Sequence, residues 1–428
     1  MRKVLYVCHN HPANAPGGAE RYAYELYQAV RKAGEFEPII VSRAGPPQSL
    51  EPPHKGTRFA LAGKDPNEYY FHTGFEEFDR LLWTAHSKRM YTEDWRAFLH
   101  TVKPDIVHFR HAVLLGYDMI RETRSTLPNV PIVYTLSEFV PICHNNGQMV
   151  RTETLELCYA ASPRRCHQCF PKIPVQTFFL RERFVKSAFE LVDVFIAPSE
   201  QLRRRYIEWG IPREKIRHEA NGRVPVTPVP DPPDAGRRKR IGYIGQITRY
   251  KGVDVLLEAM KILDREGAGV QLLLHGANLE HTAAEFRERI NGLLEETSGS
   301  VRFAGRYEHA ELPRLLSAID WVIVPSIWWE NAPLVIEEAM MHRRPVICSD
   351  VGGMAEKVRD GVNGLHFRVR DPYSLADTIR RAVSTPELWD EIRAQITDPH
   401  TMDRYLETIT AMYDELLARA VPNSVASA

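Results

Sequence analysis

Residues 224–240 read Val-Pro-Val-Thr-Pro-Val-Pro-Asp-Pro-Pro-Asp-Ala-Gly-Arg-Arg-Lys-Arg, and this stretch separates two halves with the same pattern. Its five prolines and basic end predict a stiff, solvated connection. On both sides, short apolar runs are followed by amphipathic helical patterns. The runs are residues 4–8, 38–42, 105–108, 131–135 and 194–198 before the connection, and 241–245, 270–275, 301–305, 321–325 and 345–349 after it.

Short runs that are apolar on both faces are typical of buried parallel strands covered by helices. The two series therefore predict an α/β protein with two doubly wound, Rossmann-like domains. We place the first domain at residues 1–218 and the second at residues 219–399. Residues 400–428 predict a helix with one apolar face, which could pack on its own domain or return to the first.

Composition narrows the classes of partner. The chain has 428 residues with 55 basic and 55 acidic side chains, so no net charge favours nucleic acid. No apolar run reaches the ~18 residues of a membrane span. The run at residues 4–8 is too short for a signal peptide, which predicts a cytoplasmic protein. Residues 177–189 predict either a helix packed on the sheet or a basic amphipathic helix on the inner face of a membrane.

Loops that follow parallel strands are where such sheets bind ligands. Gly17 and Gly18 precede a helix and could let an anion approach free amides, or could simply turn the chain. The loop at residues 245–252 brings Arg249 and Lys251 near a helix start. That pair suits a pyrophosphate, and the alternative is an exposed basic turn. The position after a strand favours the pyrophosphate.

The stretch at residues 324–333 holds Glu330 in a loop before a helix, and Glu338 follows about two turns later. Pro333 fits the first turn of that helix, with Asn331 or Ala332 near its cap. A carboxylate can accept hydrogen bonds from two neighbouring hydroxyls of a sugar or ribose. On spacing alone, one surface Glu and one helix-face Glu are the better explanation of the pattern.

Four of the six cysteines, Cys143, Cys158, Cys166 and Cys169, fall in one short segment. The terminal Cys-x-x-Cys is a common half of a four-thiolate zinc site. Disulfides, free thiols and an iron–sulfur cluster are the alternatives, and His144 or His167 could replace one thiol. We predict structural zinc, because disulfides are rare in the cytoplasm.

Several motifs are missing from the chain. Without Asp-x-Asp, no carboxylate-bound divalent metal is expected in catalysis, so arginines, lysines and helix N-termini must meet diphosphate charge. Neither Gly-x-Gly-x-x-Gly nor a Walker-type loop occurs, which disfavours dinucleotide oxidoreductases and P-loop NTPases. His108 and His111 end a predicted strand and could contact substrate, although a histidine there is more often packed or solvated.

These residues resemble glycosyltransferase family 4, retaining enzymes with two Rossmann-like domains facing across a cleft (GT-B). The resemblance covers nearly the whole chain, and its most specific motif is the Glu-x7-Glu of Glu330 and Glu338. The matching stretches are residues 17–20, 104–108, 221–222, 245–252, 303–305, 325–326, 338–339, 345–347, 352–356 and 363–364. The cysteine segment resembles a subset of the family with a four-cysteine insertion.

The resemblance implies a role for each matching residue. Glu330, with Asn331, would bind the donor sugar near the reacting centre, and Glu338 would bind the nucleotide ribose. Lys251 would hold the diphosphate, and His111 would contact the sugar. The remaining donor contacts would come from Gly17, Gly18, Gln246, Arg249, Arg306 and Tyr307, the last two beside the base.

One position departs from the family, which usually has Arg where this chain has Gln246. Arg249 could supply the missing charge. The resemblance implies transfer of a sugar from a nucleotide sugar to a hydroxyl of a glycan, a lipid-linked glycan or a small molecule. The sequence leaves two alternatives: an epimerase-like sugar-nucleotide enzyme, and a non-catalytic scaffold.

Overall fold

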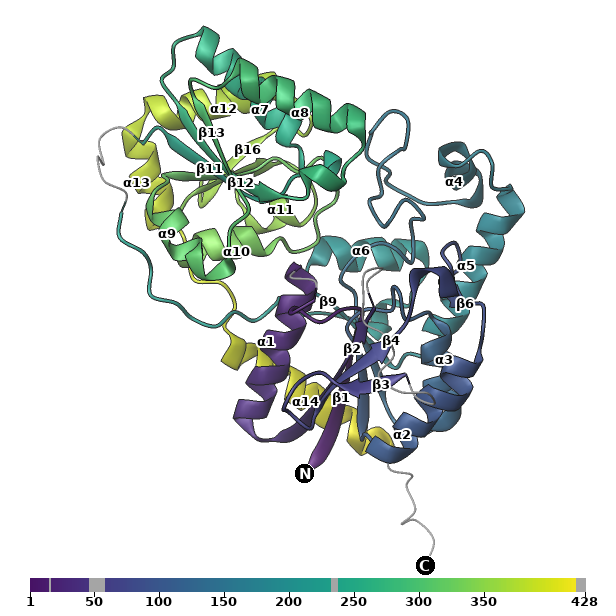
Figure 1. The fold of residues 1–428 in the computed structure, drawn as a ribbon. Coiled ribbons are helices and arrows are strands. Elements are labelled where there is room, and N and C mark those ends of the chain that lie inside the picture. Colours follow the sequence, from purple (N-terminus) through teal and green to yellow (C-terminus); the bar gives the residue numbers. More distant parts are fainter. Residues whose placement is uncertain (15–16, 46–57, 232–237, 421–428) are drawn as a thin grey trace, which may run out of the picture. The chain divides into compact units, whose positions relative to one another are not determined.

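A computed structural model describes residues 1–14, 17–45, 58–231 and 238–420 (Figure 1). These residues form two compact units, and each is described by itself. The first unit contains residues 1–222 together with the C-terminal segment from Met402, and the second contains residues 223–401. Both units are α/β, so the prediction of two doubly wound domains is confirmed.

The first unit is built on an eight-stranded sheet with the order β10-β9-β8-β7-β1-β2-β4-β3. Its strands pair in parallel, except that β3 runs antiparallel to β4. The strands are β1 Arg2–Cys8, β2 Phe36–Ala44, β3 Phe59–Leu61, β4 Glu68–His72, β7 Ile106–Phe109, β8 Ile132–Thr135, β9 Val194–Ala197 and β10 Ile216–His218, and a hairpin adds β5 Phe78–Asp79 and β6 Thr84–Ala85. The helices are α1 Gly18–Ala33, α2 Arg96–Val102, α3 Asp118–Thr126, α4 Pro163–Cys169, α5 Val175–Phe189, α6 Glu200–Trp209 and α14 Met402–Ala420.

The last helix, α14, belongs to the first unit. Its buried Tyr413 hydroxyl lies 3.2 Å from the Tyr6 hydroxyl and 2.6 Å from His108 Nδ1. The ring of Tyr405 meets Tyr22 of α1 edge-on. The apolar face that the sequence showed at this end of the chain is therefore packed on α1 and the sheet.

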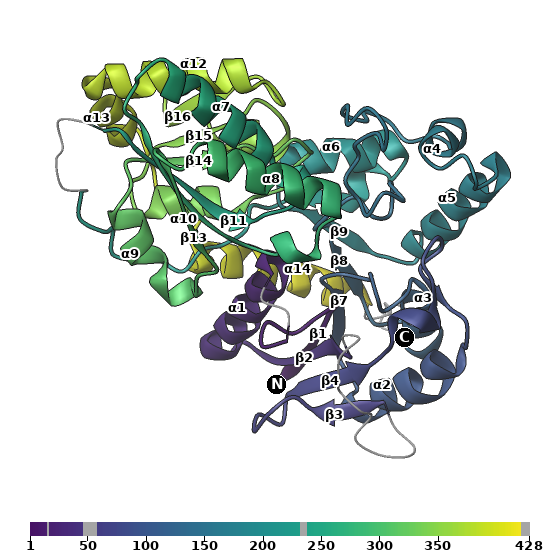
Figure 2. The same cartoon turned by 45° about the horizontal axis from the view of Figure 1, so that its top comes forward.

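The second unit has a six-stranded parallel sheet with the order β13-β12-β11-β14-β15-β16. Helices α7, α8 and α12 cover one face, and α9 and α10 cover the other (Figures 1 and 2). The strands are β11 Arg240–Gln246, β12 Gln271–Ala277, β13 Val301–Gly305, β14 Trp321–Val324, β15 Val346–Ser349 and β16 Gly364–Phe367. The helices are α7 Val253–Arg265, α8 Ala284–Glu296, α9 Leu312–Ser317, α10 Leu334–Met341, α11 Gly352–Lys357, α12 Pro372–Ser384 and α13 Pro386–Ala394.

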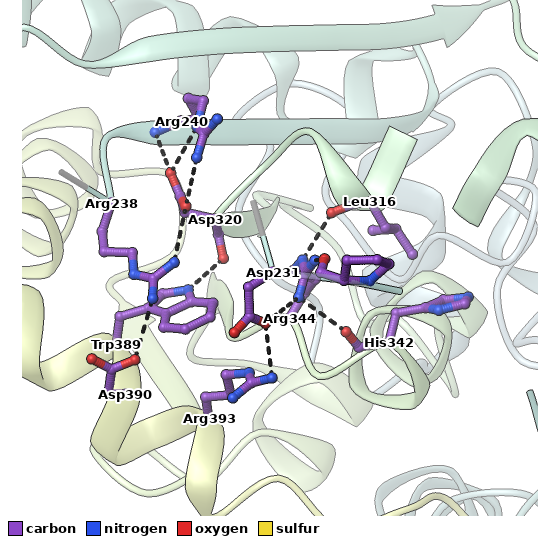
Figure 3. Close-up of polar contacts among 11 residues, drawn as sticks. Asp231, Arg238, Arg240, Leu316, Asp320, His342, Arg344, Trp389, Asp390 and Arg393 are labelled. Carbon is purple, nitrogen blue, oxygen red and sulfur yellow. Dashed lines mark hydrogen bonds and ion pairs between the residues drawn. The ribbon is translucent and has the colours of Figure 1, made fainter. Parts of the chain in front are cut away.

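Arginines tie the proline-rich connection to the second unit at the amino ends of its strands (Figure 3). Arg344 is fully buried and donates to the carbonyl oxygens of Leu316 and Pro230. Arg393 pairs with Asp231 at 2.8 Å. The described start of the connection, up to Asp231, is therefore fixed to this unit, whereas residues 232–237 lie outside the described chain.

Candidate functional site

Glu330 lies in the loop after β14 and collects three hydrogen bonds on one carboxylate oxygen. Its Oε1 accepts from Lys251 Nζ at 2.6 Å, Ser326 Oγ at 2.7 Å and Trp328 Nε1 at 2.9 Å. The residue is only 6% exposed. Within the described chain, its second oxygen, Oε2, accepts no hydrogen bond from the protein. An ionised carboxylate has acceptor sites on both oxygens, so Oε2 can receive a hydroxyl of a bound ligand.

Lys251 comes from a different loop, the 3₁₀ turn Arg249–Lys251 after β11. Its ammonium lies 5.4 Å from the Trp328 ring centre, so the indole faces the cation as well as binding Glu330. The two loops touch, since Ile327 N donates to the Tyr250 carbonyl at 2.9 Å. A Cβ on Gly252, whose φ is +68°, would lie 1.9 Å from the Pro325 oxygen. Only glycine fits this approach, and Gly252 also starts α7.

The residues after Glu330 are held by a second glycine-rich turn. Gly353 N donates to the Glu330 carbonyl at 2.6 Å, and a Cβ on Gly353 would clash with the Asn331 carbonyl at 1.6 Å. Helix α10 begins at Leu334 and Pro333 is its N-cap, which corrects the expected cap at Asn331 or Ala332. Glycines at 352 and 353 thus let the end of β15 support the Glu330 loop.

Glu338 lies on α10, buried beside an arginine and a histidine. Its Oε1 is 3.6 Å from Arg223 Nη2 and 3.9 Å from His309 Nδ1. Neither distance is a hydrogen bond, so these are charge contacts. Neither Arg223 nor Trp328 was singled out from the sequence. Ser326 lies in one of the stretches that resemble the family, but no role was predicted for it.

The other predicted donor contacts lie at the same edge of the second sheet. Gln246 ends β11 and Arg249 follows it, and both side chains are exposed. Arg306 and Tyr307 follow β13 and line a cavity of about 300 Å³. Its wall also includes Arg302, Arg314 and His275, whose pKa is lowered by burial and by Arg314. The structure therefore brings Lys251 into contact with Glu330 and places the Arg306–Tyr307 loop two strands away from β11.

In the first unit, Gly17 and Gly18 lead into α1, next to a cluster of histidines and carboxylates. Glu20 Oε1 lies 2.8 Å from His9 Nε2. Burial acts to raise the pKa of Glu20, but the hydrogen bond and charge of His9 outweigh it and leave that pKa low. The His9 ring lies 4.0 Å from the His111 ring, centre to centre. His9 and Glu20 were not predicted as site residues.

His111 and Glu138 meet in this cluster as neutral groups. His111 Nδ1 accepts from Val113 N, so its proton is on Nε2, which lies 3.6 Å from Glu138 Oε1. Burial, with the charge of His9, holds the pKa of His111 well below its usual range. Burial also raises the pKa of Glu138 to about 8. His108, in contrast, uses both ring nitrogens on Tyr413 and Thr135 and is a packing residue.

The four clustered cysteines line one small cavity. Cys143, Cys158, Cys166 and Cys169 surround a space of about 20 Å³, with His144 in the same wall. Burial raises the pKa of Cys143 to about 12 and that of Cys166 to about 11, so these thiols are protonated at neutral pH. In the described ranges, all six cysteines are free, and no three His, Cys, Asp or Glu side chains are arranged to hold a metal ion.

Two family models match the chain. The one described as Glycosyltransferase Family 4 matches residues 16–223, and the one described as Glycosyl transferases group 1 matches residues 238–385. The glycogen synthase of Mycobacterium tuberculosis is 26% identical over 408 residues, covering 90% of this chain and 86% of that protein. The α-D-kanosaminyltransferase of Streptomyces kanamyceticus is 29% identical, covering 41% of this chain and 43% of that enzyme.

Solved structures share the fold across the whole chain. Sucrose-phosphate synthase from Thermosynechococcus elongatus has a TM-score of 0.70 at 20% identity, covering 98% of this chain and all of that one. Anabaena HepE, solved with UDP and glucose, has a TM-score of 0.65 at 16% identity, covering 97% of this chain and all of that one. Together, the family models and the two doubly wound units show that the chain belongs to glycosyltransferase family 4 and is a glycosyltransferase of the GT-B fold.

Proposed function

We propose that the carboxyl edge of the second sheet binds a nucleotide sugar, and that the enzyme transfers its sugar to an acceptor hydroxyl with retention of configuration. The observation that supports this most is the Lys251–Glu330 contact, which puts a cation and an accessible carboxylate oxygen side by side. Glu330 Oε2 would accept the sugar hydroxyls, with Asn331 beside it. Glu338 would accept the ribose hydroxyls. Solved relatives with UDP support this class of donor.

We further propose that no protein nucleophile takes part. The acceptor oxygen attacks the anomeric carbon from the face that the diphosphate leaves, so one C–O bond forms as the other breaks. The proton of the acceptor hydroxyl passes to the departing phosphate oxygen. Lys251 stabilises the charge that grows on the diphosphate, and the exposed Arg249 adds to it in place of the Arg missing at Gln246.

Arg306 and Tyr307 would bind the base in the cavity that they line. In the first unit, Gly17, Gly18 and the His111 cluster would contact the donor sugar and the acceptor. The acceptor classes that we propose are a glycan, a lipid-linked glycan and a small molecule. Because His111 is neutral, with its Nε2 proton fixed by Val113, it would donate a hydrogen bond to a sugar hydroxyl rather than carry charge.

A panel of nucleotide sugars tests this function. The correct donor should raise the melting temperature, and product analysis by NMR should show the donor's anomeric configuration. Lys251→Met should slow transfer about 100-fold, whereas Lys261→Met, which changes an α7 lysine paired with Glu296, should not. Mild chelation should leave transfer unchanged.

Three results would contradict parts of this proposal. An inverted product would exclude retention, and activity that is lost with chelator and restored by manganese would exclude metal-independent transfer. A nucleotide sugar that is bound and returned only as its epimer would favour the epimerase-like alternative. Absence of binding across the panel would favour the scaffold.

We propose that the four cysteines hold one structural zinc ion. The donor set fits, since four thiols line one cavity and α4 brings Cys166 and Cys169 into one turn. The high pKa values of Cys143 and Cys166 mean that a cation is needed to deprotonate them. Closing the site requires the thiols to converge further than they do here. Zinc bound by four thiolates would order the segment and leave no position for catalytic water.

Elemental analysis of the purified protein decides this point. About one zinc per chain is expected, and Cys166→Ser should lose it and lower the melting temperature together. Cys348→Ala is the control, because it removes a buried thiol at the end of β15 without touching the cavity. A folded protein with neither zinc nor iron and four titratable thiols in this segment would refute the site.

We also propose weak contact of α5 with a membrane surface. None of the helices in the described ranges is long and apolar enough to cross a bilayer. Helix α5 buries Phe178, Val185 and Phe189, which accounts for most of its apolar face. Phe179 and Leu180 remain exposed, with Arg183 stacked near Phe179.

A further inference from the structure

We infer that Arg223 is a positioning residue for Glu338, holding that carboxylate ionised and aimed at the nucleotide ribose. The inference rests on the proposed function, which gives Glu338 its ribose role. Arg223 reaches two neighbouring carboxylates of α10. Its Nη2 lies 3.6 Å from Glu338 Oε1, and its Nε lies 3.9 Å from Glu337 Oε2.

The backbone fixes Arg223 beside α10. Its N–H donates to the His400 carbonyl at 2.8 Å, and it pairs with Thr401 as an isolated bridge. Here the chain enters the second unit at Arg223 and leaves it at Thr401. Only 6% of Arg223 is exposed, so its side chain has little freedom to leave the carboxylates.

The second carboxylate explains why arginine is needed. Glu337 is also buried and already pairs with Lys357. A planar guanidinium can face both carboxylates at once, whereas a lysine ammonium is a single point of charge. Without Arg223, Glu338 would lose this cation while the buried Glu337 stayed beside it.

The ionised form of Glu338 is the form that matters for ribose. An ionised carboxylate only accepts hydrogen bonds, so both of its oxygens can receive vicinal hydroxyls. A nearby cation favours that form, and a like charge opposes it. The contact between Arg223 and Glu338 is longer than a hydrogen bond. Arg223 therefore places a positive charge near the carboxylate of Glu338 without donating a hydrogen bond to it. Arg223 therefore acts on the ribose through Glu338 rather than by touching it.

The test compares nucleotides with and without the 2′-hydroxyl. Calorimetry would measure binding of the uridine, guanosine and adenosine diphosphates and their 2′-deoxy forms. For the nucleotide that the parent binds, Arg223→Met should weaken the ribose form about tenfold. The 2′-deoxy form should change less than about twofold, because its contact with Glu338 is already reduced. Glu338→Gln should show the same pattern, and Arg223→Lys should recover part of the loss.

The matched control is Arg344→Met, a buried arginine at the opposite edge of the same sheet. It should lower the melting temperature and leave the ratio of ribose to deoxyribose affinity unchanged. If Arg223→Met weakens both nucleotides equally, or neither, the positioning role is wrong; Arg223→Lys carries the same test if the Met variant does not fold. If the parent binds no nucleoside diphosphate, the proposed function itself fails.

Discussion

Asp320 and Glu330 stand at opposite ends of the same strand, β14, and both are buried acids facing cations. At the amino end, Asp320 Oδ2 accepts from Arg240 N at 2.9 Å and Arg240 Nε at 3.2 Å. Its Oδ1 lies 3.4 Å from Arg240 Nη2 and 3.7 Å from Arg238 Nη1 (Figure 3). At the carboxyl end, Glu330 gathers three donors on Oε1 alone.

The difference lies in what each carboxylate has left to bind. Both oxygens of Asp320 are engaged by the protein, and Trp389 packs over Arg238 with its ring centre 3.4 Å away. Asp320 therefore joins strands to the helix α13. The three donors of Glu330 all bind Oε1 and fix the orientation of the carboxylate. They leave Oε2 for a ligand. A buried carboxylate is structural when both of its oxygens bind protein groups. When only one oxygen does so, the other can still bind a ligand.

Glu330→Gln should give the largest effect. The amide keeps the size of the side chain but loses the charge that faces Lys251 and the ability to accept on both sides. Transfer should fall about 1,000-fold. Rates measured with saturating donor, together with an unfolding curve, check this.

The control for Glu330→Gln is the thermal stability of the variant, which shows whether its fold is intact. We expect the melting temperature to stay within about 3 °C of the parent, a change of at most about 1 kcal/mol in the free energy of unfolding. A transfer rate of Glu330→Gln within a few-fold of the parent would contradict the proposed role of Glu330, which would then be a structural residue like Asp320.

Asp320→Asn should have the opposite effect: it should lower stability and leave the transfer rate unchanged. It removes the buried negative charge between Arg238 and Arg240 and leaves only the exposed Asp390 beside Arg238, and the expected loss of stability is about 3 kcal/mol. At a temperature where the variant is folded, its transfer rate should match the parent. Urea unfolding and activity measured on the same sample test both halves. A variant of normal stability with low activity would show that the amino edge also serves the reaction.

The second unit shows how much the sequence could predict. Its strands were located within one or two residues, except β16, whose short Gly-Leu-His-Phe segment has no clear apolar run. Lys251 was predicted because it follows a strand and carries charge, whereas the role of Glu330 came from the family resemblance. Their contact could not be predicted, since it depends on Gly252 and Gly353 letting three loops touch.

The first unit was predicted less completely. The edge strands β3 and β10, and β4 beside β3, carry polar or exposed residues, so no apolar run marked them. His111 was singled out by its place after a strand, but its neighbours His9 and Glu20 come from another strand end and a helix. Ring stacking and a neutral Glu138 arise from burial, which a single sequence does not reveal.

Glu138 is a third acid to set beside Asp320 and Glu330. In the described chain, no lysine or arginine forms an ion pair with it. Burial raises its pKa from 4.5 to about 8. The folded protein therefore binds a proton that the unfolded chain releases, so stability is full below about pH 4.5 and declines as pH rises toward about 8. Glu138→Gln keeps a neutral group and removes that decline, which is at most about 1.4 kcal/mol per pH unit.

Urea unfolding at about pH 5 and about pH 8 measures this difference. The parent should lose more stability than Glu138→Gln over that interval. Parallel losses in the two proteins would mean that Glu138 is ionised in the folded state and paired with His111 after all. The acid would then resemble Asp320 instead of standing apart from it.

The smallest effect is expected on the surface of α5. Its buried residues anchor the helix, and only Phe179, 49% exposed, and Leu180, 60% exposed, remain for a bilayer. Burying each fully is worth about 1.5–3 kcal/mol, and Arg183 adds attraction to anionic lipid, so binding should be weak and lost at high salt. Flotation with anionic vesicles at low salt should recover a fraction of the protein, and Phe179→Ser with Leu180→Ser should abolish it. Helix α7, whose apolar face is fully packed, shows what a purely structural amphipathic helix looks like. If the parent does not float with the vesicles at low salt, α5 is a purely structural helix like α7, and Phe179 and Leu180 have no membrane role.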